Sequence, residues 1–333
     1  MNPAALLATV TGRREPALAL LIVLLLVLIG LRAPFFITLD SFEGVLTDTS
    51  ILTMLAVAEM LVILTRGIDL SLAANVALTG MAMALLSQAY PDLPVIAYVV
   101  GAMLFGAGLG AFNGFFVAVV GLPPIVVTLG TLSMFRGLVF VLSGGAWVNK
   151  HEMSVTYQTF PMNRFLGLPH LLWIAIIVIP LMWVFMRHTK AGRSLYAIGG
   201  NPQAARYVGV PVAARLFMAY ALAGLIAGLS GYLWTARFAV AYTEIAVGLE
   251  LVVIAACVIG GVSIAGGVGT IPGAVLGALF LGIIANALPV MGWSPFWKQA
   301  ISGAIILVAV VVNSRSERRK GKIIVRRAEE HPR

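Results

Sequence analysis

Three charged side chains lie within long apolar stretches, where an unpaired charge is costly and usually marks function. They are Glu59, Arg136 and Glu250. At about 1.5 Å per helical residue, Glu59 lies roughly 10 Å from Arg66, whereas Arg136 lies near the middle of its stretch. Glu59 and Arg136 can therefore pair directly only if a helix tilts or breaks. The alternative is that backbone carbonyls or water satisfy each of them.

A polar interruption between Leu64 and Ala74 separates two apolar stretches. Within it, Asp69 and Ser71 directly precede the second stretch. Free amides and the helix dipole at a helix N-terminus favour oxygen acceptors, so both side chains can cap the helix that follows. Capping alone would account for these two residues.

The sequence lacks the motifs that an enzyme or an autonomous pump would need. It contains no phosphate-binding loop ending in Gly-Lys-Ser or Gly-Lys-Thr, and the glycine-rich stretch 260–273 has no lysine. The four histidines show no metal-ligand spacing, and the single cysteine, Cys257, excludes an internal disulfide. We expect no catalytic activity, no metal and no cofactor.

Membrane helices must position these side chains, because the composition excludes a water-soluble fold. Only 11% of the 333 residues are charged, whereas soluble domains carry about 25%. The longest uncharged stretches, 93–135 and 251–297, each exceed twice the roughly 20 apolar residues that span a bilayer. Each of these stretches must therefore hold two spans.

We expect an all-α integral membrane protein whose residues 1–333 form a single transmembrane domain of about ten spans. The first apolar stretch follows Arg13 and Arg14 and is not followed by a cleavage pattern, so it predicts a retained helix. The expected spans are 17–37, 45–65, 70–88, 94–120, 124–143, 170–186, 213–235, 246–264, 270–288 and 297–313.

The basic residues predict the orientation, since cytoplasmic segments carry an excess of lysine and arginine. With the N-terminus inside, Arg13, Arg14 and Arg66 fall on the cytoplasmic side, as do five basic residues in 187–215 and eight after Asn313. Both termini are then cytoplasmic. The basic tail 314–333 is interpreted as an anchor at an anionic lipid surface rather than a nucleic-acid site, despite a net charge of +9.

Two hydrophilic loops interrupt the spans. The outer loop, 144–169, contains Trp147, Tyr157 and Phe160, which suits a folded lid or an interfacial aromatic anchor. The inner loop, 187–212, contains a glycine pair that permits a sharp turn, and then Asn201, which can cap a short helix over 203–207. A short helix on the cytoplasmic face suits the docking of a soluble partner.

A short motif in the fourth expected span resembles one in the ninth. Gly106-Ala107-Gly108-Leu109-Gly110-Ala111 resembles Gly273-Ala274-Val275-Leu276-Gly277-Ala278. Spans five apart run in opposite directions, which is the relation expected of the inverted repeats in many transporters. The alternative is that small residues recur wherever membrane helices pack closely.

Four short motifs, in order along the chain, resemble those of a known family. They are Gly67-Ile68-Asp69-Leu70-Ser71; Phe112-Asn113-Gly114 with Val127-Thr128-Leu129-Gly130-Thr131; Ala197-Ile198-Gly199-Gly200-Asn201-Pro202-Gln203-Ala204-Ala205-Arg206; and Gly260-Gly261-Val262-Ser263 with Gly266-Gly267-Val268-Gly269-Thr270. In these the chain resembles the membrane permeases of bacterial ribose, xylose and rhamnose ABC importers, a group that includes importers of furanosyl autoinducer signals. It departs at Arg66, where many members carry glycine, at Leu72-Ala73, which replaces a common Val-Gly, and at Tyr207, where a small residue is usual.

The resemblance implies a permease subunit in the bacterial inner membrane that forms the translocation pathway for a monosaccharide-like solute. Its implied partners are cytoplasmic ATP-binding subunits, a second permease subunit, identical or homologous, and a periplasmic solute-binding protein. Within the cytoplasmic coupling loop 187–212, the implied ATPase-coupling surface comprises Gly199, Gly200, Asn201, Pro202, Ala204, Ala205 and Arg206. Candidates for a pathway or a structural motif are Glu59, Asp69, Ser71, Asn113, Gly130 and Arg136.

The rival hypothesis is a secondary transporter or channel for a small polar solute that works without ATP. An ion-coupled transporter would want an acidic side chain near the membrane midplane, and the sequence places none there securely. ATP-dependent uptake in reconstituted vesicles would discriminate between the two classes.

The predicted topology can be tested by cysteine labelling in a Cys257→Ala background. A cysteine at position 150 should react with an impermeant thiol reagent in intact cells, and a cysteine at position 195 should not. The reverse pattern would mean that the topology is inverted.

Overall fold

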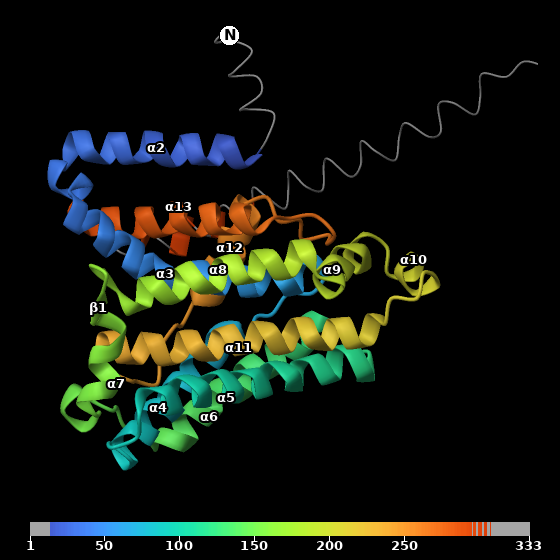
Figure 1. The fold of residues 1–333 in the computed structure, drawn as a ribbon, viewed down its shortest axis with the longest axis horizontal. Coiled ribbons are helices and arrows are strands. Elements are labelled where there is room, and N and C mark those ends of the chain that lie inside the picture. The colour runs from blue at the N-terminus through green and yellow to red at the C-terminus, as the bar shows by residue number, and fades with distance from the viewer. Residues whose placement is uncertain (1–13, 295, 298, 302, 305–306, 308–333) are drawn as a thin grey trace, which may run out of the picture.

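The structure is a computed structural model that describes residues 14–294 together with 296, 297, 299–301, 303, 304 and 307. Figure 1 shows long helices lying side by side along one common direction, which confirms the expected all-α class. In chain order the elements are α2 (Arg14–Arg32), η1 (Pro34–Ile37), α3 (Leu39–Leu64), α4 (Leu72–Ala89), α5 (Val95–Phe115), the π-helical η2 (Phe116–Val120), α6 (Pro124–Ser143), η3 (Lys150–Glu152), α7 (Val155–Thr159), η4 (Phe160–Met162), β1 (Arg164–Phe165), β2 (Leu168–Pro169), α8 (His170–His188), α9 (Lys190–Gly200), α10 (Pro202–Tyr207), α11 (Val212–Phe238), α12 (Leu249–Ile259) and α13 (Ile271–Val290).

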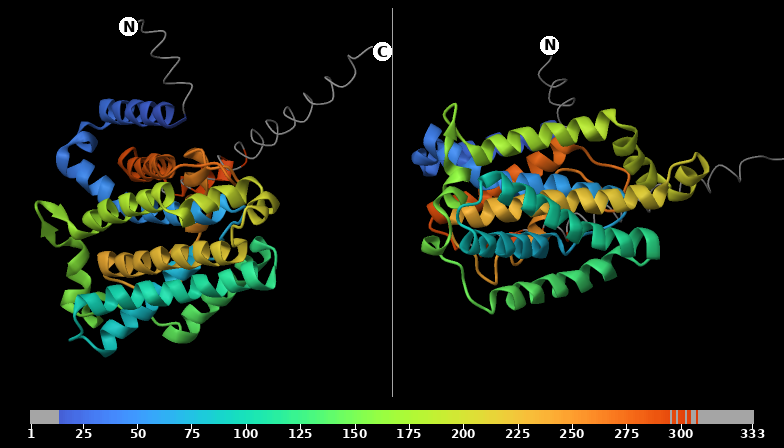
Figure 2. Two further views of the ribbon diagram at one scale, coloured as in Figure 1. Left: turned by 45° about the vertical axis from the view of Figure 1, so that its right-hand side comes forward. Right: turned by 60° about the horizontal axis from the view of Figure 1, so that its bottom comes forward.

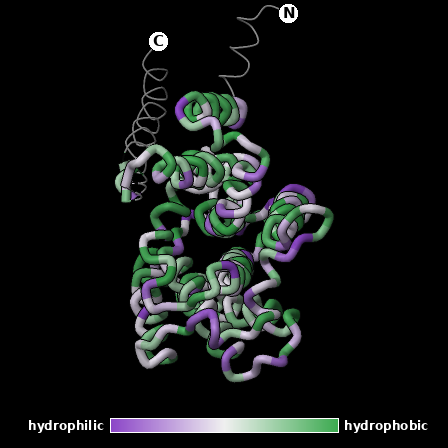
Figure 3. Tube along the Cα trace, turned by 90° about the vertical axis from the view of Figure 1, so that its left-hand side faces the viewer, coloured by the Kyte–Doolittle hydropathy of each residue, from purple (hydrophilic) through white to green (hydrophobic). Residues whose placement is uncertain are grey.

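Eight helices within the described residues are long and apolar enough to cross a membrane, and they correspond to eight of the ten expected spans. They are α2, α3, α4, α5 with η2, α6, α8, α11 and α13. Figure 3 views the bundle along the helix axes and shows largely hydrophobic helices, with hydrophilic residues concentrated in stretches of the connections. The expected span 297–313 is described at only a few positions, and the basic tail 314–333 lies outside the described residues.

The expected continuous span 246–264 is wrong. The helix there, α12, has 11 residues, or about 16 Å at 1.5 Å per residue, which is half of the roughly 30 Å hydrocarbon layer. It ends at Ile259 with Gly260 as its C-cap, and Gly261, Gly266 and Gly267 then adopt positive φ angles of 87°, 85° and 73°. Because glycine accepts this region without a steric penalty, the chain folds into a compact loop over 260–270 instead of continuing as a helix.

Contacts between loops define two ends of the bundle. At one end, which we call the inner end, Gly267 donates its amide to Leu64 O and Thr270 donates its hydroxyl to Glu15. The loop 187–212 lies at this same end (Figure 1). The expected cytoplasmic segments that the structure describes therefore share one end. Because Leu195 is fully buried there, the exposed Gln203 is a better inner position than 195 for labelling.

The outer loop 144–169 is folded against the opposite, outer end. Asn149 and Glu152 form a capping box, and the Asn149 backbone amide, donating at 2.7 Å, holds the pKa of Glu152 below its usual range. Glu152 also accepts from Gln88 at the end of α4, and Tyr157 is buried with its hydroxyl against Thr235. These contacts match the expectation of a folded lid.

Glycines set the most extensive contact between two helices, that of α5 with α11, which lie side by side in Figures 1 and 2. A Cβ at Gly106 would overlap Gly224 O, and a Cβ at Gly110 would overlap Tyr220 O. Hydrocarbon supplies no hydrophobic drive between helices, so backbone approach through small residues replaces it.

The echoed motif in α13 also packs by glycine, since a Cβ at Gly277 would overlap Ala256 O of α12. α5 ends at the inner end, where Asn113 bonds to Ser71, whereas α13 begins there at Ile271. The two motifs therefore run in opposite directions, as an inverted repeat requires. Close packing explains the glycines by itself, and the repeat stays a prediction.

Substitution of Gly110 should destabilise the bundle far more than substitution of its neighbour Gly108. Gly110→Val forces α5 and α11 apart, and overpacking of this kind costs about 1–3 kcal/mol. Gly108→Val is the matched control, because a Cβ at Gly108 meets no atom within 4 Å. The measurement is thermal unfolding of the purified protein in detergent. Equal Tm values for the two variants would contradict the packing account.

Candidate functional site

Three chain segments meet at the inner end through backbone contacts: residues 64–66, 199–200 and 266–267. We call this contact the inner junction. The Arg66 guanidinium donates to Gly199 O at 2.7 Å and to Gly200 O at 2.8 Å, and Gly267 N donates to Leu64 O at 2.9 Å. A Cβ at Gly199 would overlap both Leu64 O and Gly267 N. The inner junction therefore ties the loop 187–212 directly to α3 and to the loop 260–270.

Arg66 occupies a position that favours glycine. The end of α3 is a Schellman motif, in which Arg66 N donates to Ile63 O and Gly67 N donates to Val62 O, and Arg66 has a φ of 69°. A left-handed non-glycine residue costs on the order of 1–2 kcal/mol. The two charge-assisted bonds from its side chain offset that cost. These bonds explain how arginine is tolerated at position 66, where many of the permeases that the chain resembles have glycine.

The loop 187–212 forms two helices rather than the single short helix that the sequence predicted. Thr189 caps α9 by accepting from Gly192 N at 2.9 Å. Asn201 caps α10 by accepting from Gln203 N and Ala204 N, both at 3.0 Å, which confirms the predicted capping.

The predicted coupling residues fall into a buried group and a more exposed group. Gly199 lies in the inner junction, and Ala205 is buried against Ile198 and Val212, so neither offers a surface to a partner. Gly200, Asn201, Ala204 and Arg206 are exposed, and Pro202 is half-buried. The sequence reasoning missed two apolar side chains: Tyr207 is 92% exposed and Val208 79%. Tyr207 was noted only as a departure from the family pattern.

A buried polar chain lies behind the inner junction and holds the turn between α3 and α4. Glu59 accepts from Asp69 N at 3.0 Å. Asp69 accepts from Ser71 N at 3.0 Å and from the Ser71 hydroxyl at 2.6 Å, and Asn113 Nδ2 donates to that hydroxyl at 2.7 Å. The structure thus brings together four of the six pathway or motif candidates. Asp69 fixes the residue that precedes α4, whereas Ser71, the N-cap of α4, makes no side-chain capping bond, so the predicted capping by Ser71 is wrong. Thr128 on α6 adds a bond to Ile68 O, a contact with no signal in the sequence.

Arg136 and Gly130 lie apart from the buried polar chain. Arg136 donates to Ile245 O near the outer end and has Glu250 nearby, so the structure does not pair it with Glu59. The backbone-carbonyl alternative therefore describes Arg136. Gly130 is exposed on α6, where a Cβ would meet no atom within 4 Å. The pathway-lining role of Asn113 and Gly130 stays a prediction.

The chain is similar to known membrane transport proteins. Residues 41–310 match the family described as the permease component of branched-chain amino acid transport systems. The chain belongs to this permease family. It is a multi-pass membrane permease, homologous to transport proteins rather than to enzymes.

Two relatives illustrate the relationship. The chain is 35% identical over 319 residues to the ribose import permease RbsC of Escherichia coli K12, covering 93% of this chain and 99% of the relative. It is also 35% identical over 310 residues to the autoinducer 2 import permease LsrC of Shigella flexneri, covering 93% of this chain and 90% of the relative. No solved structure matches the chain. The resemblance to ribose-type and autoinducer-type permeases is thereby confirmed.

The inner junction predicts that substitution of one of two adjacent glycines of the permease has an effect and substitution of the other has none. Gly199→Ala should loosen α9 from α3, because its Cβ has no space, whereas Gly200→Ala should have no effect, because a Cβ there meets no atom within 4 Å. The readout is trypsin cleavage at the exposed Arg193 and Arg206 in inside-out vesicles. We expect roughly tenfold faster cleavage for Gly199→Ala, since proteolysis follows local opening. Indistinguishable rates would mean that the inner junction does not hold the loop.

Proposed function

We propose that this chain is the membrane-pathway subunit of an ATP-driven importer for a monosaccharide-like solute, such as ribose, rhamnose or an autoinducer-type molecule. The similarity to RbsC and LsrC along more than nine tenths of the chain supports the solute class. The proposal places the protein in the bacterial inner membrane with both termini in the cytoplasm. It has no enzymatic activity, and separate subunits supply the energy.

The observation that carries the proposal is the inner junction beneath an exposed apolar surface. Tyr207 and Val208 project from the loop 187–212, at the end of the bundle where the sequence predicts cytoplasm. A contiguous apolar patch outside the membrane marks an interaction site, and we propose that the adjacent Tyr207 and Val208 form one for a protein partner. The backbone contacts at Gly199 and Gly267 leave little freedom between that surface and the spans. A soluble ATPase that moved this loop would therefore move α3 and the loop 260–270 with it.

The remaining partners follow from the same proposal. A second permease, identical or homologous, completes the path, and a periplasmic solute-binding protein delivers the solute to the outer end. The exposed apolar faces of the long helices meet lipid or that second permease. The exposed Gly130 on α6 suits a close approach by a neighbouring helix.

An ATP-independent transporter or channel is the competing function. The buried acids Glu59 and Asp69 could be taken as its coupling groups. Their accepted hydrogen bonds instead fix the turn over 65–71, because they come from the Asp69 amide and from Ser71. This geometry supports a structural role and favours the ATP-driven function.

The proposal predicts ATP-dependent uptake that fails when the loop surface is made polar. The permease is reconstituted with its ATPase and binding protein, and uptake of labelled D-ribose, D-xylose and L-rhamnose is measured with and without ATP. The double variant Tyr207→Ser, Val208→Ser should lower ATPase co-purification and uptake at least about tenfold, the loss expected when two apolar contacts are removed.

The matched control is Leu166→Ser, which removes an apolar side chain that is 77% exposed in the outer loop. It should leave ATPase association unchanged. Uptake without ATP in the wild type would establish the competing function. If the double variant bound the ATPase normally, Tyr207 and Val208 would not belong to the docking site.

A further inference from the structure

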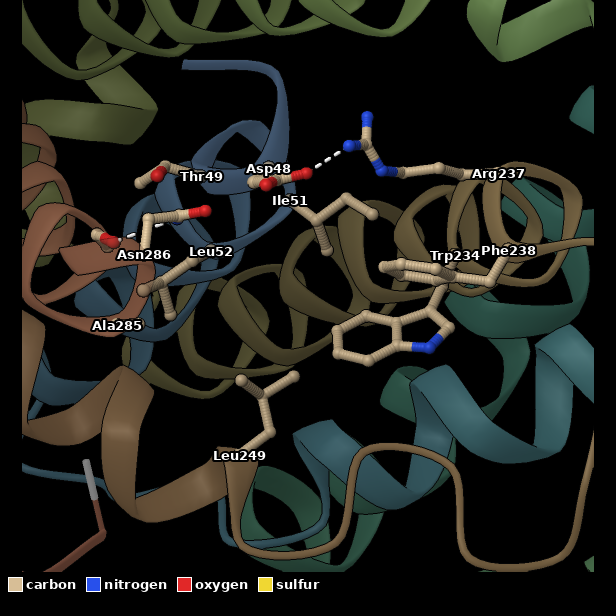
Figure 4. Close-up of a pocket in the computed structure, with 11 residues that line it drawn as sticks. Asp48, Thr49, Ile51, Leu52, Trp234, Arg237, Phe238, Leu249, Ala285 and Asn286 are labelled. Atoms are coloured by element: carbon tan, nitrogen blue, oxygen red, sulfur yellow. Dashed lines mark hydrogen bonds and ion pairs between the residues drawn. The ribbon is translucent and has the colours of Figure 1, made fainter. Parts of the chain in front are cut away.

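A cavity of about 230 Å³ lies between α3, α11, α12 and α13. Figure 4 shows its wall: Asp48 and Arg237 form an ion pair along one side, the indole of Trp234 presents a broad face, and Asn286 lies beside Thr49 and Leu52. Leu249, at the start of α12, forms the opposite wall. None of these residues was predicted from the sequence to form a site.

The size of the cavity suits one small ring. An engineered protein cavity of about 150 Å³ accepts benzene, and this one is larger. A cavity of about 230 Å³ is large enough for a single pentose or hexose ring and too small for a disaccharide.

The lining has the chemistry that a polyhydroxylated ring needs. Asn286 Nδ2 donates to Gly282 O at 2.9 Å, which orients the amide and leaves its Oδ1 able to accept from a solute hydroxyl. The Trp234 face can cover the apolar C–H face of a sugar, while its indole N–H is a donor. Asp48 and Arg237 add a carboxylate acceptor and a forked donor. Apolar walls with a few fixed polar groups are typical of small-molecule sites.

The residues that line the cavity lie toward the outer end of the bundle. Asp48 keeps 37% of its side chain exposed at the mouth, while Arg237 is 14% exposed. Farther along α3, Ala56 O accepts from Cys257 Sγ at 3.1 Å, and both residues are fully buried. This contact between α3 and α12 separates the cavity from the buried polar chain. A solute arriving from outside would enter the cavity and stop there.

We infer that this cavity is an outer solute subsite that holds one monosaccharide ring, with Trp234 covering the ring face and Asn286 accepting from a hydroxyl. The inference rests on the proposed function for the class of solute. The Asp48–Arg237 ion pair orders the mouth, and its groups bind hydroxyls at the edge of the ring.

The test measures sugar protection of a cysteine placed in the cavity wall. Ala285, a lining residue, is changed to cysteine in the Cys257→Ala background, and the purified permease is alkylated without ATPase or ATP. D-Ribose, D-xylose, L-rhamnose and D-glucose are tested separately. At least one should slow alkylation, whereas sucrose at the same concentration should not. Lys150→Cys, in the exposed outer loop, is the control that no sugar should protect.

Two further variants tie the protection to the proposed contacts. Trp234→Ala and Asn286→Ala should each raise the sugar concentration for half protection about tenfold, whereas Trp234→Phe keeps an aromatic face and should retain most of the affinity. Absence of protection by every monosaccharide, or equal protection in the alanine variants, would overturn the subsite.

The two proposals can fail separately. Protection of position 285 by a sugar that is taken up without ATP would refute the ATP-driven function and leave the subsite standing. ATP-driven uptake of a sugar that does not protect position 285 would refute the subsite alone.

Discussion

Backbone-to-backbone contact at glycines is the constraint on which this permease depends. In lipid, helices gain nothing from hiding apolar side chains from one another, so they associate where small residues permit close van der Waals contact. Gly106 and Gly110 bring α5 against α11, and Gly277 brings α13 against α12. Gly199 extends the same device to the membrane surface, where it joins a loop helix to the end of a span. The stability of the bundle and the stiffness of its inner end thus have one physical origin.

Polar groups inside the bundle are arranged to satisfy the backbone where the helices break. The turn over 65–71 exposes amides that no helix can use; Glu59 accepts from the Asp69 amide, and Asp69 accepts from the Ser71 amide. Asn113 then links that turn to α5. An unpaired amide in hydrocarbon costs several kcal/mol, so non-helical backbone at this depth persists only where protein groups cover it. Glu59 and Asp69 therefore contribute to the structure of this turn through these bonds.

Much of this arrangement could be predicted from local signals, and the remainder could not. Hydropathy located eight long spans, and Asn201 was identified as a cap because capping depends on neighbouring residues only. The break at Gly260 was missed because hydropathy reports only that the stretch is apolar. It does not report the positive φ angles of the glycines that end the helix. Arg66 and Gly199 are 133 residues apart, and no sequence pattern reports their contact. The outer cavity was missed for the same reason, because its lining comes from four helices.

The short length of α12 has a mechanical consequence. Its first residue, Leu249, forms a wall of the outer cavity, and the loop that follows its last residue enters the inner junction at Gly267. A helix of about three turns therefore connects the cavity wall to the loop that enters the inner junction. α12 thus joins the outer cavity to the inner junction with a helix about half as long as a full span.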